Sequence, residues 1–91
     1  MNSIETTLTI CNQKGLHARA AAAFVKCISN IDADIVVIKD GQEVDGSSIL
    51  SLMMLAASKG SSIVIRANGA EAQRAIDELT LLVNSRFGED S

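Results

Sequence analysis

Hydrophobic and polar residues alternate over the first ten positions, with Ile4, Thr6, Leu8 and Ile10 on one side of the pattern. Strict alternation is typical of a strand that buries one face. A polar segment over 12–15 then interrupts it. We therefore predict a half-buried strand that ends at about residue 10.

An alanine-rich segment follows over 18–29, and its larger apolar residues recur at helical spacing. This period predicts a helix packed by one face. Four consecutive β-branched residues over 35–38 predict a second strand. The Asp-Gly pair at 40–41 is the preferred centre of a two-residue hairpin turn, so a short partner strand should occupy 42–45.

A second helical pattern begins after Ser47 and Ser48, and serine is a preferred residue at a helix N-cap. We expect this short amphipathic helix to bury Ile49 and Met53. The lysine–glycine pair at 59–60 should end it, because glycine readily adopts the left-handed cap conformation.

A second β-branched run predicts a strand at 63–65, and a final helix should occupy 70–85 with one apolar stripe. We expect the acidic residues Glu89 and Asp90 beyond it to be loose. The resulting order is β-α-β-β-α-β-α, without linker or repeat. It predicts a single α+β domain over 1–91, an open sheet with helices on one face.

Charge and aromatic content exclude several functions. The 91-residue chain has a net charge of −3, and its only aromatic residues are two phenylalanines. A binder of nucleic acid or of an anionic membrane needs a basic surplus, and a single-strand binder needs aromatic platforms. The N-terminus has no basic and apolar signal segment, so we expect a soluble, cytoplasmic protein.

The segment Lys14-Gly15-Leu16-His17-Ala18-Arg19-Ala20 lies between the first strand and the first helix. A helix N-terminus offers free N–H groups to an anion, and Arg19 offers a planar fork to phosphate oxygens. An imidazole is largely neutral at about pH 7, so His17 has a ring nitrogen available as a nucleophile. These features together suit transient attachment of a phosphoryl group.

A purely structural role would also account for His17, because a lone histidine at a helix N-terminus is often an ordinary exposed or capping residue. The chain has one histidine and no CxxC pair, so we expect neither a metal site nor a cofactor. Without a second histidine or a catalytic carboxylate pair nearby, a self-contained enzyme is not expected.

Gly15-Leu16-His17-Ala18-Arg19, placed between strand and helix, resembles the active-site signature of HPr, the phosphocarrier family of the bacterial phosphotransferase system. The resemblance runs from Ile4 to Phe87. It implies an open-faced β-sandwich, in which three helices cover one face of a four-stranded antiparallel sheet. It also implies that an Enzyme I-type protein, dependent on phosphoenolpyruvate, phosphorylates His17 on Nδ1. His17 would then donate to a histidine of an EIIA-type protein, with Arg19 coordinating the phosphate.

Two departures bear on this resemblance. Family members often carry proline directly after the arginine, where this chain has Ala20 and no proline anywhere. Alanine is a good helix former, so the chemistry should be unaffected. The segments 52–55 and 83–90 look more like NPr, the nitrogen-related branch, which would imply nitrogen-type Enzyme I and EIIA partners.

In the family, partners dock on the first two helices around the active histidine. The resemblance therefore implies a partner surface, for which we name Leu16, Ala20, Leu50 and Met54. We expect mixed exposure for the last two, and a carrier that docks in this way should be a monomer.

Ser48 matches the serine that an ATP-dependent HPr kinase phosphorylates in some bacteria, although a helix N-cap alone would also explain it. This leaves an alternative function, a non-catalytic regulatory binding module that an HPr kinase/phosphorylase controls by phosphorylation at Ser48. Because a pure binder has no need of His17, we favour the carrier.

Overall fold

The computed structural model describes residues 3–91. Its elements are β1 (Ser3–Thr9), α1 (Ala18–Ile28), β2 (Asp34–Lys39), β3 (Gln42–Asp45), α2 (Ile49–Met54), β4 (Ser62–Asn68), α3 (Ala72–Asn84) and a 3-10 helix, η1 (Arg86–Gly88). Apart from η1, this order is the predicted one.

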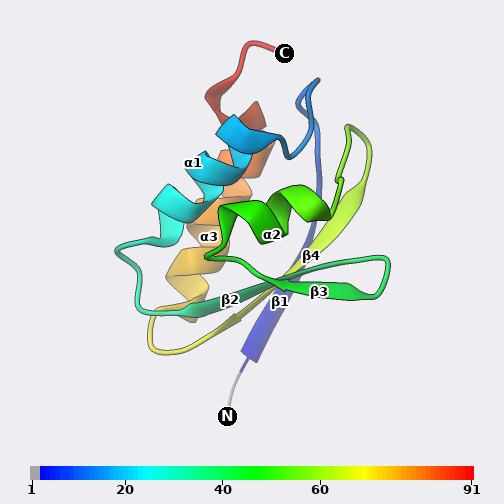
Figure 1. Ribbon diagram of the computed structural model, residues 1–91. Coiled ribbons are helices and arrows are strands. Elements are labelled where there is room, and N and C mark those ends of the chain that lie inside the picture. Colours follow the sequence, from blue (N-terminus) through cyan, green and yellow to red (C-terminus); the bar gives the residue numbers. More distant parts are fainter. Residues whose placement is uncertain (1–2) are drawn as a thin grey trace.

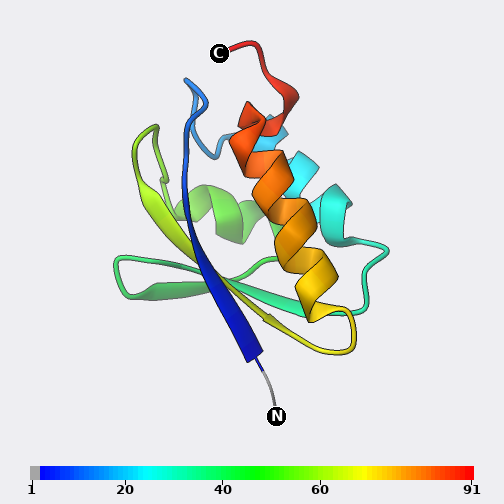
Figure 2. The same ribbon diagram turned by 180° about the vertical axis from the view of Figure 1, so that it is seen from behind.

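The four strands form one antiparallel sheet in the order β1-β4-β2-β3. The register places Ile65 of the inner strand β4 opposite Thr6 of β1 and Val37 of β2. The helices cover one face of the sheet and leave the other open (Figures 1 and 2). The predicted α+β open-faced sandwich is therefore confirmed.

The core lies between the sheet and the helices. Along β4, buried residues alternate with half-buried or exposed ones, and Phe24 of α1 and Leu79 of α3 are fully buried. The predicted stripe on α3 is also buried; it consists of Ala72, Ile76, Leu79 and Val83. Within residues 3–91, the structure contains no helix with both the length and the apolar character needed to span a membrane.

The end of α2 differs from the prediction. The helix stops at Met54, and the residue with left-handed backbone is Ala56, at φ +52°. Gly60 has a positive φ too, but it lies in a later turn where its N–H donates to the carbonyl of Ile10. The predicted end at 59–60 is therefore wrong, because that glycine serves the turn leading into β4.

The burial of α2 also differs from the prediction. Six residues make fewer than two turns, and Leu52 is the residue of α2 that is buried. Ile49 and Met53, which we expected in the core, are 41% and 38% exposed. So short a helix has too narrow a buried stripe to bury them as well.

Candidate functional site

His17 is the N-cap residue of α1. Its backbone is extended (φ −79°, ψ −176°), and its carbonyl accepts the N–H of Ala21 at 2.8 Å. The first N–H groups of a helix have no intrahelical acceptor and stand at the positive end of the helix dipole. The histidine therefore lies where the backbone favours an anion.

The loop that leads to His17 is fixed on two sides. The N–H of Leu16 donates to the carbonyl of Ala57 at 2.8 Å, which ties the loop to the segment after α2. The amide of Asn12, fully buried, donates from Nδ2 to the carbonyl of Gly15 at 2.8 Å. Gly15 itself has a φ of +68°, which glycine adopts readily.

The two ring nitrogens of His17 differ in their surroundings. Nε2 lies 2.6 Å from Oε2 of Glu89, whose side chain is 12% exposed. Nδ1 forms no hydrogen bond with any of residues 3–91. The expectation that Glu89 is loose is therefore wrong, because its carboxylate is held between His17 and Asn12, which donates to Oε1 at 3.0 Å.

Arg19 lies next to this histidine at the exposed start of α1. His17 lines one shallow hollow of about 260 Å³ with Lys14 and Met53, and Arg19 lines another of about 280 Å³ with Lys14 and Glu89. Within residues 3–91 the Arg19 guanidinium forms no ion pair or hydrogen bond, so its donors face solvent.

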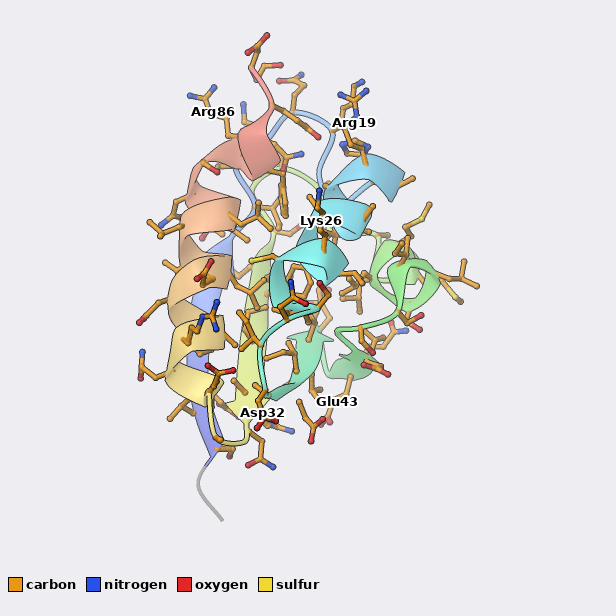
Figure 3. The ribbon with its side chains drawn as sticks, turned by 90° about the vertical axis from the view of Figure 1, so that its left-hand side faces the viewer. Arg19, Lys26, Asp32, Glu43 and Arg86 are labelled. Carbon is orange, nitrogen blue, oxygen red and sulfur yellow. The ribbon has the colours of Figure 1, made fainter. Side chains whose placement is uncertain are left out.

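Figure 3 shows how charges are distributed between the two ends of the molecule. Arg19 and Arg86 lie at the end that carries the residues after α3, whereas Asp32 and Glu43 lie at the opposite end. The end with His17 thus carries the cationic side chains of Arg19 and Arg86 together with the Glu89 carboxylate, and the first N–H groups of α1 favour an incoming anion there.

Residues 4–85 match the family model of the phosphorylation site of the HPr component of the phosphotransferase system. The chain belongs to the HPr family. It is 38% identical over 86 residues to HPr of Cupriavidus necator, covering 94% of this chain and 97% of that protein. It is 36% identical over 91 residues to NPr of Shewanella violacea, covering 100% of both. A crystal structure of HPr from Thermoanaerobacter tengcongensis has a TM-score of 0.92 at 40% identity, covering 97% of this chain and 99% of that one. The predicted family and phosphocarrier role are confirmed.

A further feature of this HPr-family chain is an apolar surface on α2. Leu50 and Met54 are 68% and 67% exposed, and with Ile49 and Met53 they form what we call the α2 patch. Met53 lines the same hollow as His17, so the patch borders the histidine.

Two residues named for the partner surface are instead in the core. Leu16 is 4% exposed and Ala20 is fully buried. Both face the interior because the loop backbone packs on Ala57 and because Ala20 lies on the buried face of α1. Neither side chain offers area to a partner, so that part of the prediction is wrong.

Ser48 is the N-cap residue of α2. Its Oγ accepts the N–H of Ser51 at 3.2 Å, and its side chain is half-buried. The predicted capping position is thereby settled in favour of Ser48, since Ser47 instead donates its hydroxyl to Asp45 at 2.7 Å.

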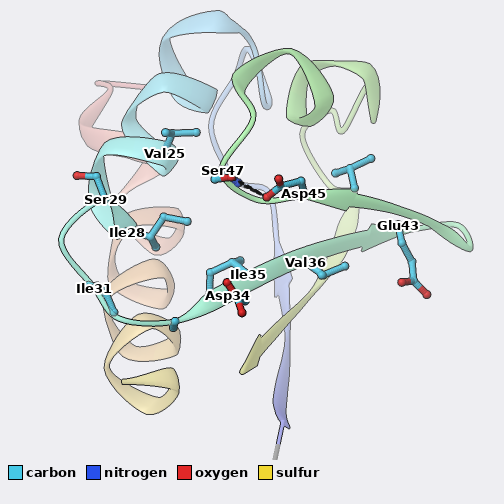
Figure 4. A pocket seen from close by; sticks show the side chains of 12 residues that line it. Val25, Ile28, Ser29, Ile31, Asp34, Ile35, Val36, Glu43, Asp45 and Ser47 are labelled. Atoms are coloured by element: carbon cyan, nitrogen blue, oxygen red, sulfur yellow. Dashed lines mark hydrogen bonds between the residues drawn. The ribbon is translucent and has the colours of Figure 1, made fainter. Parts of the chain in front are cut away.

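A third hollow lies away from His17. It has a volume of about 700 Å³ and lies between the C-terminal part of α1 and strands β2 and β3 (Figure 4). Its lining is mainly apolar, with Val25, Ile28 and Val44, and it includes neither His17 nor Arg19. It is therefore separate from the hollows that His17 and Arg19 line.

Proposed function

We propose that His17 accepts a phosphoryl group on Nδ1 from an Enzyme I-type protein and passes it to a histidine of an EIIA-type protein, in the cytoplasm. The observation that supports this role is the asymmetry of the ring. Nε2 is hydrogen-bonded to Glu89, whereas Nδ1 has no partner within residues 3–91 and lies at the start of α1. A nitrogen with a free lone pair at a helix N-terminus suits nucleophilic attack on phosphorus.

The remaining groups have roles that follow from their positions. The Arg19 guanidinium would bind phosphate oxygens through two parallel N–H donors, and the first N–H groups of α1 would bind another. Phosphoryl transfer depends mainly on positioning and on stabilising the charge of the equatorial oxygens. A site with no enclosing walls is sufficient, because the partner protein supplies the other side.

The α2 patch is the surface on which we expect both partners to dock. Exposed methionine and leucine side chains form adaptable apolar contacts, which suits a carrier that must bind two different proteins in turn. We propose that the chain does this as a single domain, residues 1–91, and as a monomer. Identity to the sugar-type and nitrogen-type relatives is similar, at 38% and 36%, so both kinds of partner need to be tested.

The experiment is an intact-mass spectrum after incubation with phosphoenolpyruvate and either a sugar-type or a nitrogen-type Enzyme I. We expect the gain of one acid-labile phosphoryl group, faster with the enzyme of the matching branch. His17→Ala should stay folded and gain nothing. Phosphoryl uptake by a folded His17→Ala protein would overturn the assignment.

A second candidate function rests on Ser48. Its hydroxyl lies at the start of α2, beside the exposed side chain of Ile49 in the α2 patch. A phosphate added there by an HPr kinase/phosphorylase-type enzyme would bring a charge of about −2 to the docking surface. If the protein is a regulatory binding module, partner binding should survive His17→Ala unchanged and no phosphoryl group should be gained from Enzyme I.

A further inference from the structure

The carboxylate of Glu89 bridges the active-site histidine and a buried amide. Oε2 lies 2.6 Å from Nε2 of His17, and Oε1 accepts Nδ2 of Asn12 at 3.0 Å. The same Nδ2 donates to the carbonyl of Gly15 at 2.8 Å. Since that carbonyl needs a donor, the orientation of the Asn12 amide is fixed, and Nδ2 must face Glu89.

The path of the chain after α3 brings Glu89 to this place. Arg86 and Phe87 both have left-handed backbone, at φ +60° and +56°, and the Phe87 side chain is buried. The turn directs the following residues over the start of α1 (Figures 1 and 2). Arg86 also donates from Nη1 to the carbonyl of Asp90 at 3.0 Å, which holds the segment against η1.

The ionisation of Glu89 determines which ring nitrogen carries the proton. The hydrogen bond from Asn12 holds the pKa of Glu89 below its ordinary value, and His17 and Lys14 lower it further. An ionised carboxylate can only accept hydrogen bonds, so Nε2 of His17 must be the donor. In a neutral imidazole the other nitrogen, Nδ1, then carries the lone pair.

We propose that Glu89 is a positioning residue, which keeps the proton of His17 on Nε2 and so makes Nδ1 the nucleophile for the phosphoryl group. This inference rests on the proposed function of His17. In the transfer step, the Nδ1 lone pair forms the new phosphorus–nitrogen bond. The bond between phosphorus and the donor protein's histidine breaks, and that nitrogen keeps the electron pair.

The proton on Nε2 stays in place during this step, so the phosphorylated ring carries a positive charge. The Glu89 carboxylate lies 2.6 Å from the nitrogen that shares this charge. A fixed opposite charge at that distance stabilises the ring as its charge develops. An acceptor on the far nitrogen of a histidine sets the tautomer and stabilises the cation in the same way in hydrolase triads.

Glutamine at position 89 provides the sharpest test. Its single amide oxygen would be taken by Nδ2 of Asn12, so its NH₂ group would face Nε2 of His17. That group donates, so it favours a ring with the proton on Nδ1, which blocks the nucleophile. Alanine at 89 removes the acceptor without supplying a donor. The predicted order of acceptance rates is therefore wild type, then Glu89→Ala, then Glu89→Gln.

A residue that merely anchored the segment after α3 would give the opposite order for the two variants, because glutamine preserves more of the contacts than alanine. The matched control is Asp90→Asn, the same chemical change one residue further on. The Asp90 side chain forms no hydrogen bond with residues 3–91, so this variant should behave as the wild type.

Two measurements on the full chain decide the question. The first is a ¹⁵N–¹H spectrum of the imidazole at about pH 8, where an imidazole is largely neutral; His17 is the only histidine, so its signals need no assignment. We expect the proton on Nε2 in the wild type and in Asp90→Asn, and on Nδ1 in Glu89→Gln.

The second measurement is the initial rate of phosphoryl gain from Enzyme I, with folding of each variant checked by thermal unfolding. We expect Glu89→Gln to be slower than the wild type by about tenfold or more. A wild-type ring protonated on Nδ1, or equal rates for Glu89→Gln and Asp90→Asn, would overturn the role of Glu89. A wild type that gains no phosphoryl group would instead overturn the proposed function itself.

Discussion

The backbone of Gly15 lies directly against that of Ala57. An ideal Cβ on Gly15 would overlap the carbonyl oxygen of Ala57 and would lie 2.9 Å from the α-carbon of Ser58. The same carbonyl accepts the N–H of Leu16. The close approach of these two segments therefore holds the loop before His17 in place, and only a residue without a Cβ permits it.

Replacement of this glycine should destabilise the protein. Gly15→Ala combines a left-handed φ with the overlap on Ala57, and we expect it to lower the free energy of unfolding by about 2 kcal/mol or more. Gly41→Ala is the control, because Gly41 also has a positive φ, whereas a Cβ there meets nothing within 4 Å among residues 3–91. Urea unfolding should show a loss of only about 1 kcal/mol for the control. Equal losses would mean that the contact with Ala57 contributes nothing.

Removal of the Arg19 guanidinium should slow phosphoryl transfer without changing its site. Arg19→Ala is expected to lower the initial rate by about tenfold, because a bidentate charge-assisted pair with the phosphate is lost. Lys26→Ala, which removes a positive charge from the last turn of the same helix, should leave the rate nearly unchanged. Rates that fall equally in both variants would indicate general electrostatic attraction rather than coordination by Arg19.

The α2 patch should control docking and not stability. Leu50→Ser removes an exposed apolar side chain, so we expect an unchanged melting temperature and a concentration of Enzyme I for half-maximal rate that rises by about fivefold. Leu81→Ser, on α3 and similarly exposed, is the matched control and should change neither quantity. The proposed docking surface would be wrong if the two variants behaved alike.

The two neighbouring serines before α2 should differ in their contribution to stability, because Ser48 caps the helix and Ser47 does not. Ser48→Ala should cost about 1 kcal/mol, because the N–H of Ser51 loses its acceptor. Ser47→Ala should cost less, since among residues 3–91 the exposed Ser47 hydroxyl donates to Asp45 alone. Ser48→Asp keeps an acceptor at the cap, so it should preserve stability while its charge slows phosphoryl acceptance. Urea unfolding and the mass assay measure these effects, and an unslowed Ser48→Asp would count against regulation at this position.

Stability should depend on pH through Glu89. Its pKa in the folded protein lies below the ordinary value of 4.5, with the hydrogen bond from Asn12 as the largest cause. The unfolded chain therefore binds the proton more readily than the folded protein does. The contribution of ionised Glu89 to the free energy of unfolding is complete above about pH 4.5. It is lost as the pH falls through the lower pKa of the folded state. Thermal unfolding should be measured between about pH 7 and about pH 3. The difference in melting temperature between the wild type and Glu89→Gln should shrink toward the acidic end of this range. A difference that stays constant over this range would contradict the assigned pKa shift.

Much of the architecture was predictable because it depends on neighbouring residues. Alternation over β1, helical spacing over α1 and α3, and the Asp-Gly turn between β2 and β3 all act over a few positions. His17 and Arg19 were predictable for the same reason, since a strand, a short loop and a helix N-terminus are local features. The pattern was least informative on α2, where six residues are too few to define a buried stripe.

Contacts between distant segments were decided by the tertiary structure alone. The burial of Leu16 and Ala20 follows from the packing of the loop on the segment after α2 and of α1 on the core. The contact of Glu89 with His17 joins residues 72 positions apart and depends on the left-handed turn at Arg86 and Phe87. Periodicity reports which face of an element is buried, but it carries no information about where the chain goes after the element ends. The histidine at the start of α1 could therefore be found in the sequence, whereas the carboxylate that contacts its ring emerged only when the chain was folded.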